Sequence, residues 1–351
     1  MSSIERILSE GHEQLSIFQA QEVGLTAIVS IHNTRIGPAL GGCRMRQYQN
    51  LDEALFDALR LSEGMTYKNA LCGINFGGGK SVIVADRNLT TGRKELFQKF
   101  GTFVNSLGGS YITAEDMGTS VSDMSEILKT CPYVAGRDQA SGGGGDPSPF
   151  TARGVFEGMR ACLKHVFGSS DFLGRHVAIQ GVGHVGYYLA TYLKEAGAKV
   201  TIADTREEVA RQVAESLHVE LVSSDVILSL PCDILSPCAV GAVINDQSVK
   251  SLQCRIIAGA ANNQLLGQSV VSELTKKGIV YAPDFAINAG GVILCADEFE
   301  PGGFTESRVL ERVKNIYGTI DKILSESKSK TLFTEVIALE MAKERILKSK
   351  R

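Results

Sequence analysis

The sequence predicts an α/β protein of two domains, the first a mixed α/β domain and the second a doubly wound parallel sheet covered by helices. Three observations lead to this expectation. The segment 141–149 holds four consecutive glycines and two prolines, which neither a helix nor a central strand accommodates. Helical and strand patterns alternate regularly after this segment and irregularly before it. The length of 351 residues is enough for two hydrophobic cores of ordinary size.

The part of the chain before the glycine segment contains both kinds of element. Residues 51–62 carry apolar side chains at the spacing of an α-helix, and the short runs 27–31 and 81–85 are rich in β-branched residues typical of buried strands. We therefore assign residues 1–140 to the mixed α/β domain.

The part after the glycine segment alternates strictly. The sequence predicts a helix at 151–167, a strand at 176–180, a helix at 185–195 and a strand at 199–203, with further alternation to about residue 282. Such alternation implies parallel strands joined by right-handed crossovers. Residues 141–329 are therefore expected to form the second domain. Two long helical patterns, 307–325 and 331–347, end the chain.

Composition excludes several classes of function. The net charge of −3, with no basic patch beyond a short C-terminal tail, argues against nucleic-acid binding. No apolar stretch is long enough to span a membrane and the first residues lack a signal-peptide pattern, so we expect a soluble, cytoplasmic protein. The eight cysteines form no C-x-x-C pair, which favours reduced core residues over disulfides or a metal site.

A glycine-rich turn follows the predicted strand at 176–180. Its glycines are spaced as G-x-G-x-x-G, a helical pattern begins within it, and an acidic residue, Asp204, ends the next strand. This combination indicates a Rossmann-type dinucleotide site with the pyrophosphate at the helix N-terminus. The residues expected to bind the cofactor here are Gly181, Val182, Gly183, His184, Val185, Gly186 and Asp204.

The acidic residue indicates which nicotinamide cofactor is bound. A carboxylate at Asp204 accepts hydrogen bonds from ribose hydroxyls and repels a 2′-phosphate, so the sequence favours NAD over NADP. Arg206, two residues further on, leaves some tolerance of NADP open. His184 is expected to be a solvent-facing spacer in the loop and not a catalytic group.

Two lysines, Lys68 and Lys80, flank a stretch of glycines and apolar residues. Lysine is rarely buried without a partner, so one of them could bind an anionic group while the other transfers protons. The residues Gly77-Gly-Gly-Lys80-Ser resemble a P-loop, but the required upstream glycine falls at Gly73, one position too early. The alternative is a tight turn with a surface lysine.

Two further segments carry candidate polar groups. Asp116 ends an apolar strand beside a glycine, where a side chain can reach a ligand, although it could instead cap a helix. Asn262 lies among small residues and amides after another buried strand, where the alternative is an ordinary loop.

Together these segments identify a resemblance. The chain is similar to the amino acid dehydrogenases of the glutamate/leucine/phenylalanine/valine group, and the matching segments follow one another along nearly the whole chain: 37–45, 64–70, 77–80, 111–116, 180–183, 258–265, 281–284 and 287–292.

The resemblance implies reversible, NAD-dependent oxidative deamination of an L-amino acid to a 2-oxo acid and ammonium. In that reaction Lys68 would bind the substrate carboxylate, Lys80 would be the general base for water, and Asp116 would move the proton of the amino group. Asn262 would contact the substrate and the nicotinamide ribose, and Thr151 would lie near the carboxamide. The first domain would bind substrate and form a homo-oligomer, an octamer or a dimer, and residues 330–351 would return to it.

The resemblance also implies an apolar substrate. Relatives specific for glutamate carry a lysine at the position of Leu40, and the other substrate-binding positions here are the uncharged Gly42, Ala114, Val292 and Cys295. This set favours leucine and other branched-chain amino acids. Relatives specific for leucine usually differ at Leu294 and Cys295, so phenylalanine or a broad apolar range is an open alternative. A non-catalytic NAD-binding protein and a structural or partner-binding protein are the remaining alternatives.

Overall fold

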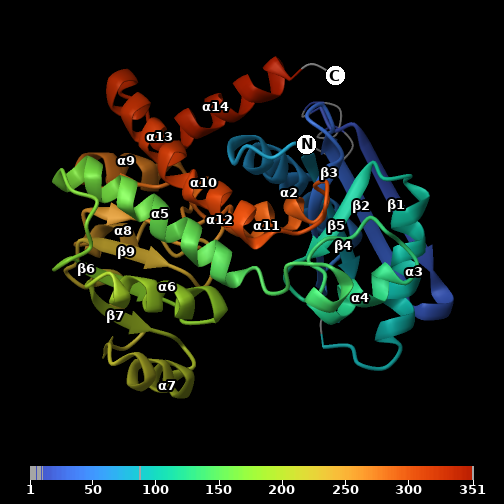
Figure 1. The fold of residues 1–351 in the computed structure, drawn as a ribbon, viewed down its shortest axis with the longest axis horizontal. Helices are drawn as coiled ribbons and strands as arrows, with labels where there is room; N and C mark the ends of the chain where they lie inside the picture. Colours follow the sequence, from blue (N-terminus) through green and yellow to red (C-terminus); the bar gives the residue numbers. More distant parts are fainter. Residues whose placement is uncertain (1–4, 6–8, 10, 87, 350–351) are drawn as a thin grey trace. The chain divides into compact units, whose positions relative to one another are not determined.

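Figure 1 shows the computed structural model, which describes residues 5, 9, 11–86 and 88–349. The chain divides into two compact units. The first unit comprises Met1–Pro147, Val292–Glu306 and Met341–Arg351, and the second comprises Ser148–Gly291 and Ser307–Glu340. The functional division at residues 140 and 330 expected from the sequence stays a proposal, since the compact units have other boundaries.

A five-stranded mixed sheet forms the centre of the first unit. Its order is β1 (Gln14–Ala20), β2 (Leu25–Asn33), β4 (Gly77–Val84), β3 (Ala39–Arg46) and β5 (Tyr111–Glu115). β2 pairs antiparallel with β1 and β4, whereas β3 pairs parallel with β4 and β5. The predicted strand at 27–31 is thus confirmed as part of β2, and that at 81–85 is confirmed as the end of β4 except for Ala85, which lies beyond the strand.

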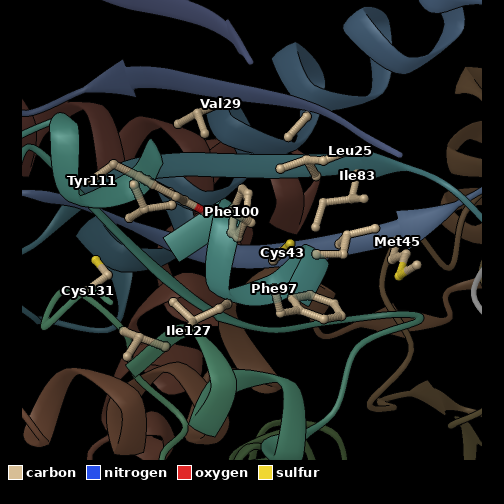
Figure 2. Packing of buried hydrophobic residues seen from close by; sticks show 14 of the residues in the cluster. Leu25, Val29, Cys43, Met45, Ile83, Phe97, Phe100, Tyr111, Ile127 and Cys131 are labelled. Atoms are coloured by element: carbon tan, nitrogen blue, oxygen red, sulfur yellow. The ribbon is translucent and has the colours of Figure 1, made fainter. Parts of the chain in front are cut away.

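Side chains alternate between the two faces of this sheet, as the geometry of a strand requires. One face packs on α3 (Arg93–Ser106) and α4 (Val121–Leu128), where Phe97, Phe100 and Ile127 lie in a core with Cys43 and Ile83 (Figure 2). The opposite face packs on α2.

The helix α2 (Leu51–Leu71) covers that opposite face through Ala54 and Ala58, which contact Ile28 and Val82. It begins at the N-cap Asn50, whose side chain accepts a hydrogen bond from the backbone of Glu53. The helical pattern predicted over residues 51–62 is confirmed, and the helix continues beyond it to Leu71. Lys68 therefore lies in its last turn.

The second unit contains a six-stranded sheet in which every pair is parallel, so the predicted doubly wound Rossmann fold is confirmed. Its strands, in spatial order, are β11 (Val280–Tyr281), β10 (Ile256–Ile257), β9 (Ile234–Pro237), β6 (His176–Gln180), β7 (Lys199–Ala203) and β8 (Glu220–Leu221). Its first five helices are α5 (Ser148–Phe167), α6 (His184–Glu195), α7 (Glu207–Leu217), α8 (Ser248–Ser251) and α9 (Gln268–Lys277). The strands β6 and β7 begin and end where the sequence predicts.

The remaining helices are α10 (Asp284–Ile287), α11 (Gly290–Asp297), α12 (Glu306–Lys314), α13 (Ile316–Lys330) and α14 (Thr334–Lys348). The expectation of one helix over 307–325 was wrong, because α12 ends before Asn315 and α13 starts after it. The backbone N–H of Asn315 bonds to Arg312, three residues back, so the last turn tightens there. Among the described helices, none combines the length and apolar character needed to cross a membrane.

Candidate active site

Lys80 lies on β4 and not in a loop, so both the P-loop and the tight-turn interpretations were wrong. Lys80 and Val82 lie two residues apart on this strand, so their side chains point to the same face of the sheet. This is the face that α2 covers. The glycines before Lys80 allow that helix to approach: a Cβ on Gly78 would lie 2.1 Å from the backbone nitrogen of Thr66 in α2. Lys80 is consequently buried, with 5% of its surface exposed.

Asp116 follows directly after β5 and pairs with Lys80, with 2.5 Å between Lys80 Nζ and Asp116 Oδ2. Burial by itself would raise the pKa of the Asp116 carboxyl, but the charges of Lys80 and Arg44 outweigh burial and hold this pKa well below its usual range. Asp116 does not cap α4, whose N-cap is Ser120. The structure thus joins two of the residues expected to transfer protons, through a contact that sequence alone could not specify.

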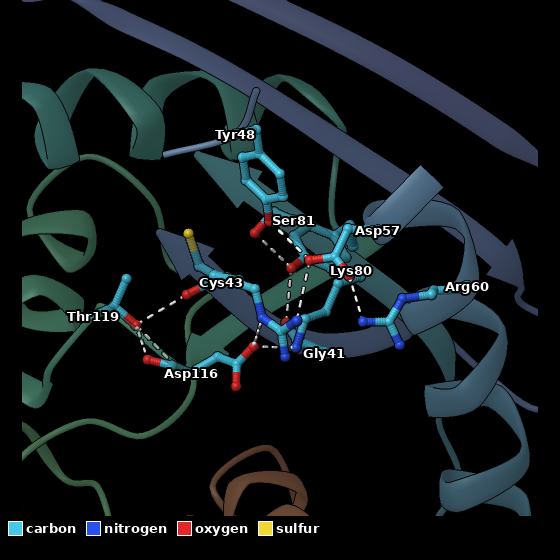
Figure 3. A network of polar contacts seen from close by, with 11 residues as sticks. Gly41, Cys43, Tyr48, Asp57, Arg60, Lys80, Ser81, Asp116 and Thr119 are labelled. Carbon is cyan, nitrogen blue, oxygen red and sulfur yellow. Dashed lines mark hydrogen bonds and ion pairs between the residues drawn. The ribbon is translucent and has the colours of Figure 1, made fainter. Parts of the chain in front are cut away.

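Arg44 was not singled out from the sequence. Its Nε lies 3.3 Å from Asp116 Oδ2, and its Nη1 donates to Asp57 Oδ2 at 3.1 Å (Figure 3). Asp57, on α2, also accepts from the Tyr48 hydroxyl at 2.8 Å and pairs with Arg60 at 2.6 Å. The only sequence signal was that Arg44 follows Gly42 closely in a segment matching the dehydrogenase group.

The expected substrate pocket residues lie on adjacent elements of the first unit. Leu40 and Gly42 are on β3, and Gly42 pairs with Ala114 on β5. A Cβ on Gly42 would lie 2.7 Å from the Cβ of Asp116, so this glycine borders the pair formed by Lys80 and Asp116. The exposed surface is 1% for Leu40 and 6% for Ala114, so both apolar side chains are buried.

The helix α11 supplies Val292 and Cys295, which are half-buried and buried respectively. Burial raises the pKa of the Cys295 thiol, with smaller effects from the charges of Glu298, Glu115 and Lys68. A buried, uncharged thiol at this position is compatible with a substrate that has an apolar side chain.

Two long-range contacts hold these pocket elements in place. Glu298, at the end of α11, accepts hydrogen bonds from Arg137 Nε at 3.1 Å and from the backbone of Gly144 at 3.1 Å. Arg345 Nη1 donates to the carbonyl oxygen of Ala70 at 2.6 Å, which caps the end of the helix that carries Lys68. Neither contact had a recognisable sequence signal, because each joins segments far apart in the chain.

In the second unit, the glycine turn between β6 and α6 has the geometry that a dinucleotide requires. Gly181 adopts a φ of +95°, and a Cβ on Gly186 would lie 2.0 Å from the carbonyl oxygen of Gly181. Gly183 is the N-cap of α6, so the helix N-terminus carries no side chain that would block a phosphate. Val182 is buried, Val185 is half-buried and His184 is exposed.

Asp204 accepts a hydrogen bond from the backbone of Val182 at 3.0 Å, so the acid and the glycine turn are adjacent. Arg206 donates two hydrogen bonds to the same carboxylate, from Nε to Oδ1 at 3.1 Å and from Nη2 to Oδ2 at 3.1 Å. Hydrogen bonds from Arg206 lower the pKa of Asp204 to about 2, against the opposing effect of burial. A cavity of about 260 Å³ beside them is lined by Asp204, Thr205, Glu207, Ala210, Arg211, Leu221, Val222, Ser223 and Ser224. These features fit the adenosine half of a nicotinamide dinucleotide.

Asn262 lies beyond β10, and Asn288 holds its side chain by donating to its Oδ1 at 2.8 Å. Sequence reasoning missed this role of Asn288, although Asn288 lies in a segment that matches the dehydrogenase group. Thr151 lies in the first turn of α5 and is half-buried. Among the residues that the structure describes, no group of three or more His, Cys, Asp or Glu side chains is placed to hold a metal ion.

A Rossmann sheet with a glycine turn and an acid, together with an ion pair between a buried lysine and a half-buried aspartate, is typical of a dehydrogenase that uses a nicotinamide nucleotide. Comparison with known families agrees: residues 12–133 match the Glu/Leu/Phe/Val dehydrogenase dimerisation domain, and residues 142–350 match the Glutamate/Leucine/Phenylalanine/Valine dehydrogenase model. The chain belongs to this family and is an amino acid dehydrogenase.

Individual relatives are similar over nearly their whole length. Leucine dehydrogenase of Geobacillus stearothermophilus is 46% identical, covering 95% of this chain and 90% of that protein. Phenylalanine dehydrogenase of Bacillus thermotolerans is 44% identical, covering 95% and 88%. The crystal structure of L-tryptophan dehydrogenase from Nostoc punctiforme superposes with a TM-score of 0.85 at 38% identity, covering 99% of both chains.

Proposed function

We propose that this enzyme catalyses the reversible, NAD-dependent oxidative deamination of apolar L-amino acids, with leucine and other branched-chain amino acids preferred. The observation that carries the proposal is the ion pair between the buried Lys80 and the half-buried Asp116, because the proposed reaction needs a carboxylate and an amine side by side. In the net reaction, an amino acid, NAD⁺ and water give a 2-oxo acid, ammonium, NADH and a proton.

Each residue has a defined task in this reaction. Lys68 binds the substrate carboxylate, and Asn262 orients the substrate through its side-chain amide. Asp116 accepts the proton of the amino group, because Cα loses hydride only when the nitrogen lone pair is free to form the C=N bond. NAD⁺, when bound, accepts that hydride. Lys80 then takes a proton from water, whose oxygen attacks the imine carbon.

The pocket residues support an apolar substrate. Leu40, Gly42, Ala114, Val292 and Cys295 are uncharged, so a glutamate side chain would lose its hydration without gaining a partner. A leucine side chain would gain about 1.5–3 kcal/mol from burial in the same place.

A second candidate is a preference for phenylalanine or for a broad range of apolar amino acids. Two observations favour it. Cys295 is smaller than valine, which leaves room for a larger substrate side chain. The Bacillus thermotolerans relative named for phenylalanine is nearly as similar as the leucine dehydrogenase.

We also propose NAD as the preferred cofactor, a homo-oligomeric assembly, and the cytoplasm as the location. Asp204 supports NAD because its carboxylate would repel a 2′-phosphate. The match of the first part of the chain to a dimerisation domain supports the oligomer. All eight cysteines are free thiols, which suits a reducing compartment.

The test is the initial rate of NADH formation at alkaline pH with leucine, isoleucine, valine, phenylalanine and glutamate. We expect turnover with the branched-chain substrates, loss of at least about 10³-fold in Lys80→Ala, and no loss in the exposed-lysine control Lys276→Ala. Preference for phenylalanine would establish the second candidate. An absence of NADH with every amino acid would refute both.

A further inference from the structure

Arg44 connects the proposed proton acceptor to a second acid that has no part in the proposed chemistry. Its guanidinium lies between Asp116, 3.3 Å away, and Asp57, 3.1 Å away. Only 12% of its side chain is exposed, and Asp57 is 7% exposed. Because Asp57 is itself held by Tyr48 and Arg60, the guanidinium has a fixed position beside Asp116.

The proposed reaction places a conflicting demand on Lys80 and Asp116. Lys80 must lose its proton before it can take one from water, but the Asp116 carboxylate 2.5 Å away stabilises the ammonium form. A carboxylate that faced Lys80 alone would resist that proton loss. Moreover, it would be left as an unbalanced, half-buried charge once Lys80 became neutral.

The position of Arg44 resolves this demand. Arg44 and Lys80 contact the same atom, Asp116 Oδ2, and Arg44 keeps its charge at every working pH. Figure 3 shows the other carboxylate oxygen of Asp116 pointing away from the dashed contacts, with no dashed line to it. Arg44 can therefore balance Asp116 during the part of the cycle in which Lys80 is neutral, and Oδ1 stays available to a ligand.

We propose that Arg44 is a positioning residue of the amino acid dehydrogenase: it fixes Asp116 through Oδ2 and balances its charge, so that Lys80 can release its proton. This inference rests on the proposed function, because the roles of Lys80 and Asp116 come from it. Arg44 itself touches neither substrate nor cofactor in this scheme.

Other charged and titratable groups near the pair come from each element packed around it. Asp116 acts electrostatically on Glu115 and Tyr111 of β5 and on Cys43 of β3. Asp123 on α4 acts on Glu115 and Cys43 in the same way. Lys68 lies further along α2. Of these, Glu115 acts in the opposite direction to Arg44, since it adds negative charge next to Asp116.

The test compares Arg44→Met, which removes the charge, with Arg44→Lys, which keeps it, and with Arg60→Met as the matched control. Arg60 pairs with Asp57 but has no role at Asp116. The readouts are the pH profile of kcat for amino acid oxidation and the pH at which acetic anhydride half-labels Lys80, measured by peptide mass spectrometry. Thermal unfolding verifies the fold, and Arg44→Gln replaces Arg44→Met if the latter does not fold.

We expect the acid limb of the kcat profile and the labelling midpoint to move upward by about 0.5–1 pH unit in Arg44→Met. Arg44→Lys should restore most of the shift, and Arg60→Met should leave both readouts at the wild-type position. A uniform fall in kcat with no movement of either midpoint would overturn the inference. An inactive wild-type enzyme would refute the proposed function instead, while the labelling midpoint would still decide whether Arg44 acts on Lys80.

Discussion

Asn288 holds the side-chain amide of Asn262 in one orientation. Asn288 Nδ2 donates to Asn262 Oδ1 at 2.8 Å and to the carbonyl oxygen of Ala260 at 2.9 Å. Asn288 is buried, whereas Asn262 is exposed. Because its Oδ1 is occupied, Asn262 presents its Nδ2 hydrogens to a ligand, which suits an anionic or carbonyl acceptor.

Replacing Asn288 should therefore weaken catalysis without touching the substrate. We expect Asn288→Asp to lower kcat/KM for the amino acid about tenfold to hundredfold, because a carboxylate of the same size cannot donate to Asn262 Oδ1. Asn288→Ala should lower kcat/KM for the amino acid by a similar factor. Steady-state kinetics with leucine measure the effect, and wild-type kcat/KM in both variants would show that Asn262 is oriented by something else.

The choice of cofactor should depend on Asp204 and Arg206 together. In Asp204→Ser, the carboxylate is gone and Arg206 is released to meet a 2′-phosphate, so we expect the ratio of kcat/KM for NADP to that for NAD to rise about 100-fold. The double variant Asp204→Ser with Arg206→Ala should lose most of that gain. Equal ratios in the single and double variants would show that Arg206 does not recognise the phosphate.

The parts of the fold that sequence predicted well are those encoded by neighbouring residues. The strand β6, the glycine turn after it and Asp204 at the end of β7 lie within about thirty residues, and each step has its own local requirement, such as the positive φ of Gly181. Local encoding explains why the strand boundaries and the glycine turn could be read directly from the sequence. Lys80 and Asp116 each lie in a recognisable local segment, so the sequence indicated each of them as a candidate but did not indicate that they form a pair.

The parts that sequence did not reveal depend on packing between distant segments. Three successive glycines have a low preference for strands, yet they lie in β4 because β2 and β3 pair with them on both sides. Arg44 meets Asp57 only because α2 packs on the sheet. The apolar pattern runs on through Asn315, so it gives no sign of the helix break.

The ion pair between Glu298 and Arg137 joins segments that are far apart in the sequence, and we expect it to contribute to the stability of the fold. The Glu298 side chain is fully buried, and its loss would leave Arg137, 19% exposed, without its charge partner. We expect Glu298→Ala to lower the free energy of unfolding by about 2–4 kcal/mol, measured by urea denaturation. Glu273→Ala breaks a solvent-exposed pair with Lys276 and should leave stability unchanged within error. Equal effects from both variants would contradict this explanation.

Glu115 should make stability depend on pH in the direction opposite to that of most carboxylates. Burial, followed by repulsion from Asp146, Asp123 and Asp116, raises the pKa of Glu115 to about 7 from its ordinary value of 4.5. Between these two pH values the folded state holds a proton that the unfolded state has lost, so the contribution of Glu115 to stability falls as the pH rises through this range.

Replacement of Glu115 by glutamine removes this ionisation while keeping the shape of the side chain. As the pH rises from 4.5 to 8, the unfolding free energy of Glu115→Gln should increase relative to that of the wild type by about 1–3 kcal/mol. Solvent screening of the half-buried carboxylate favours the lower part of this range. Urea denaturation at both pH values measures the gain, with Glu95→Gln on the exposed side of α3 as the control. A difference between wild type and Glu115→Gln that is the same at both pH values would mean that Glu115 ionises normally in the folded enzyme.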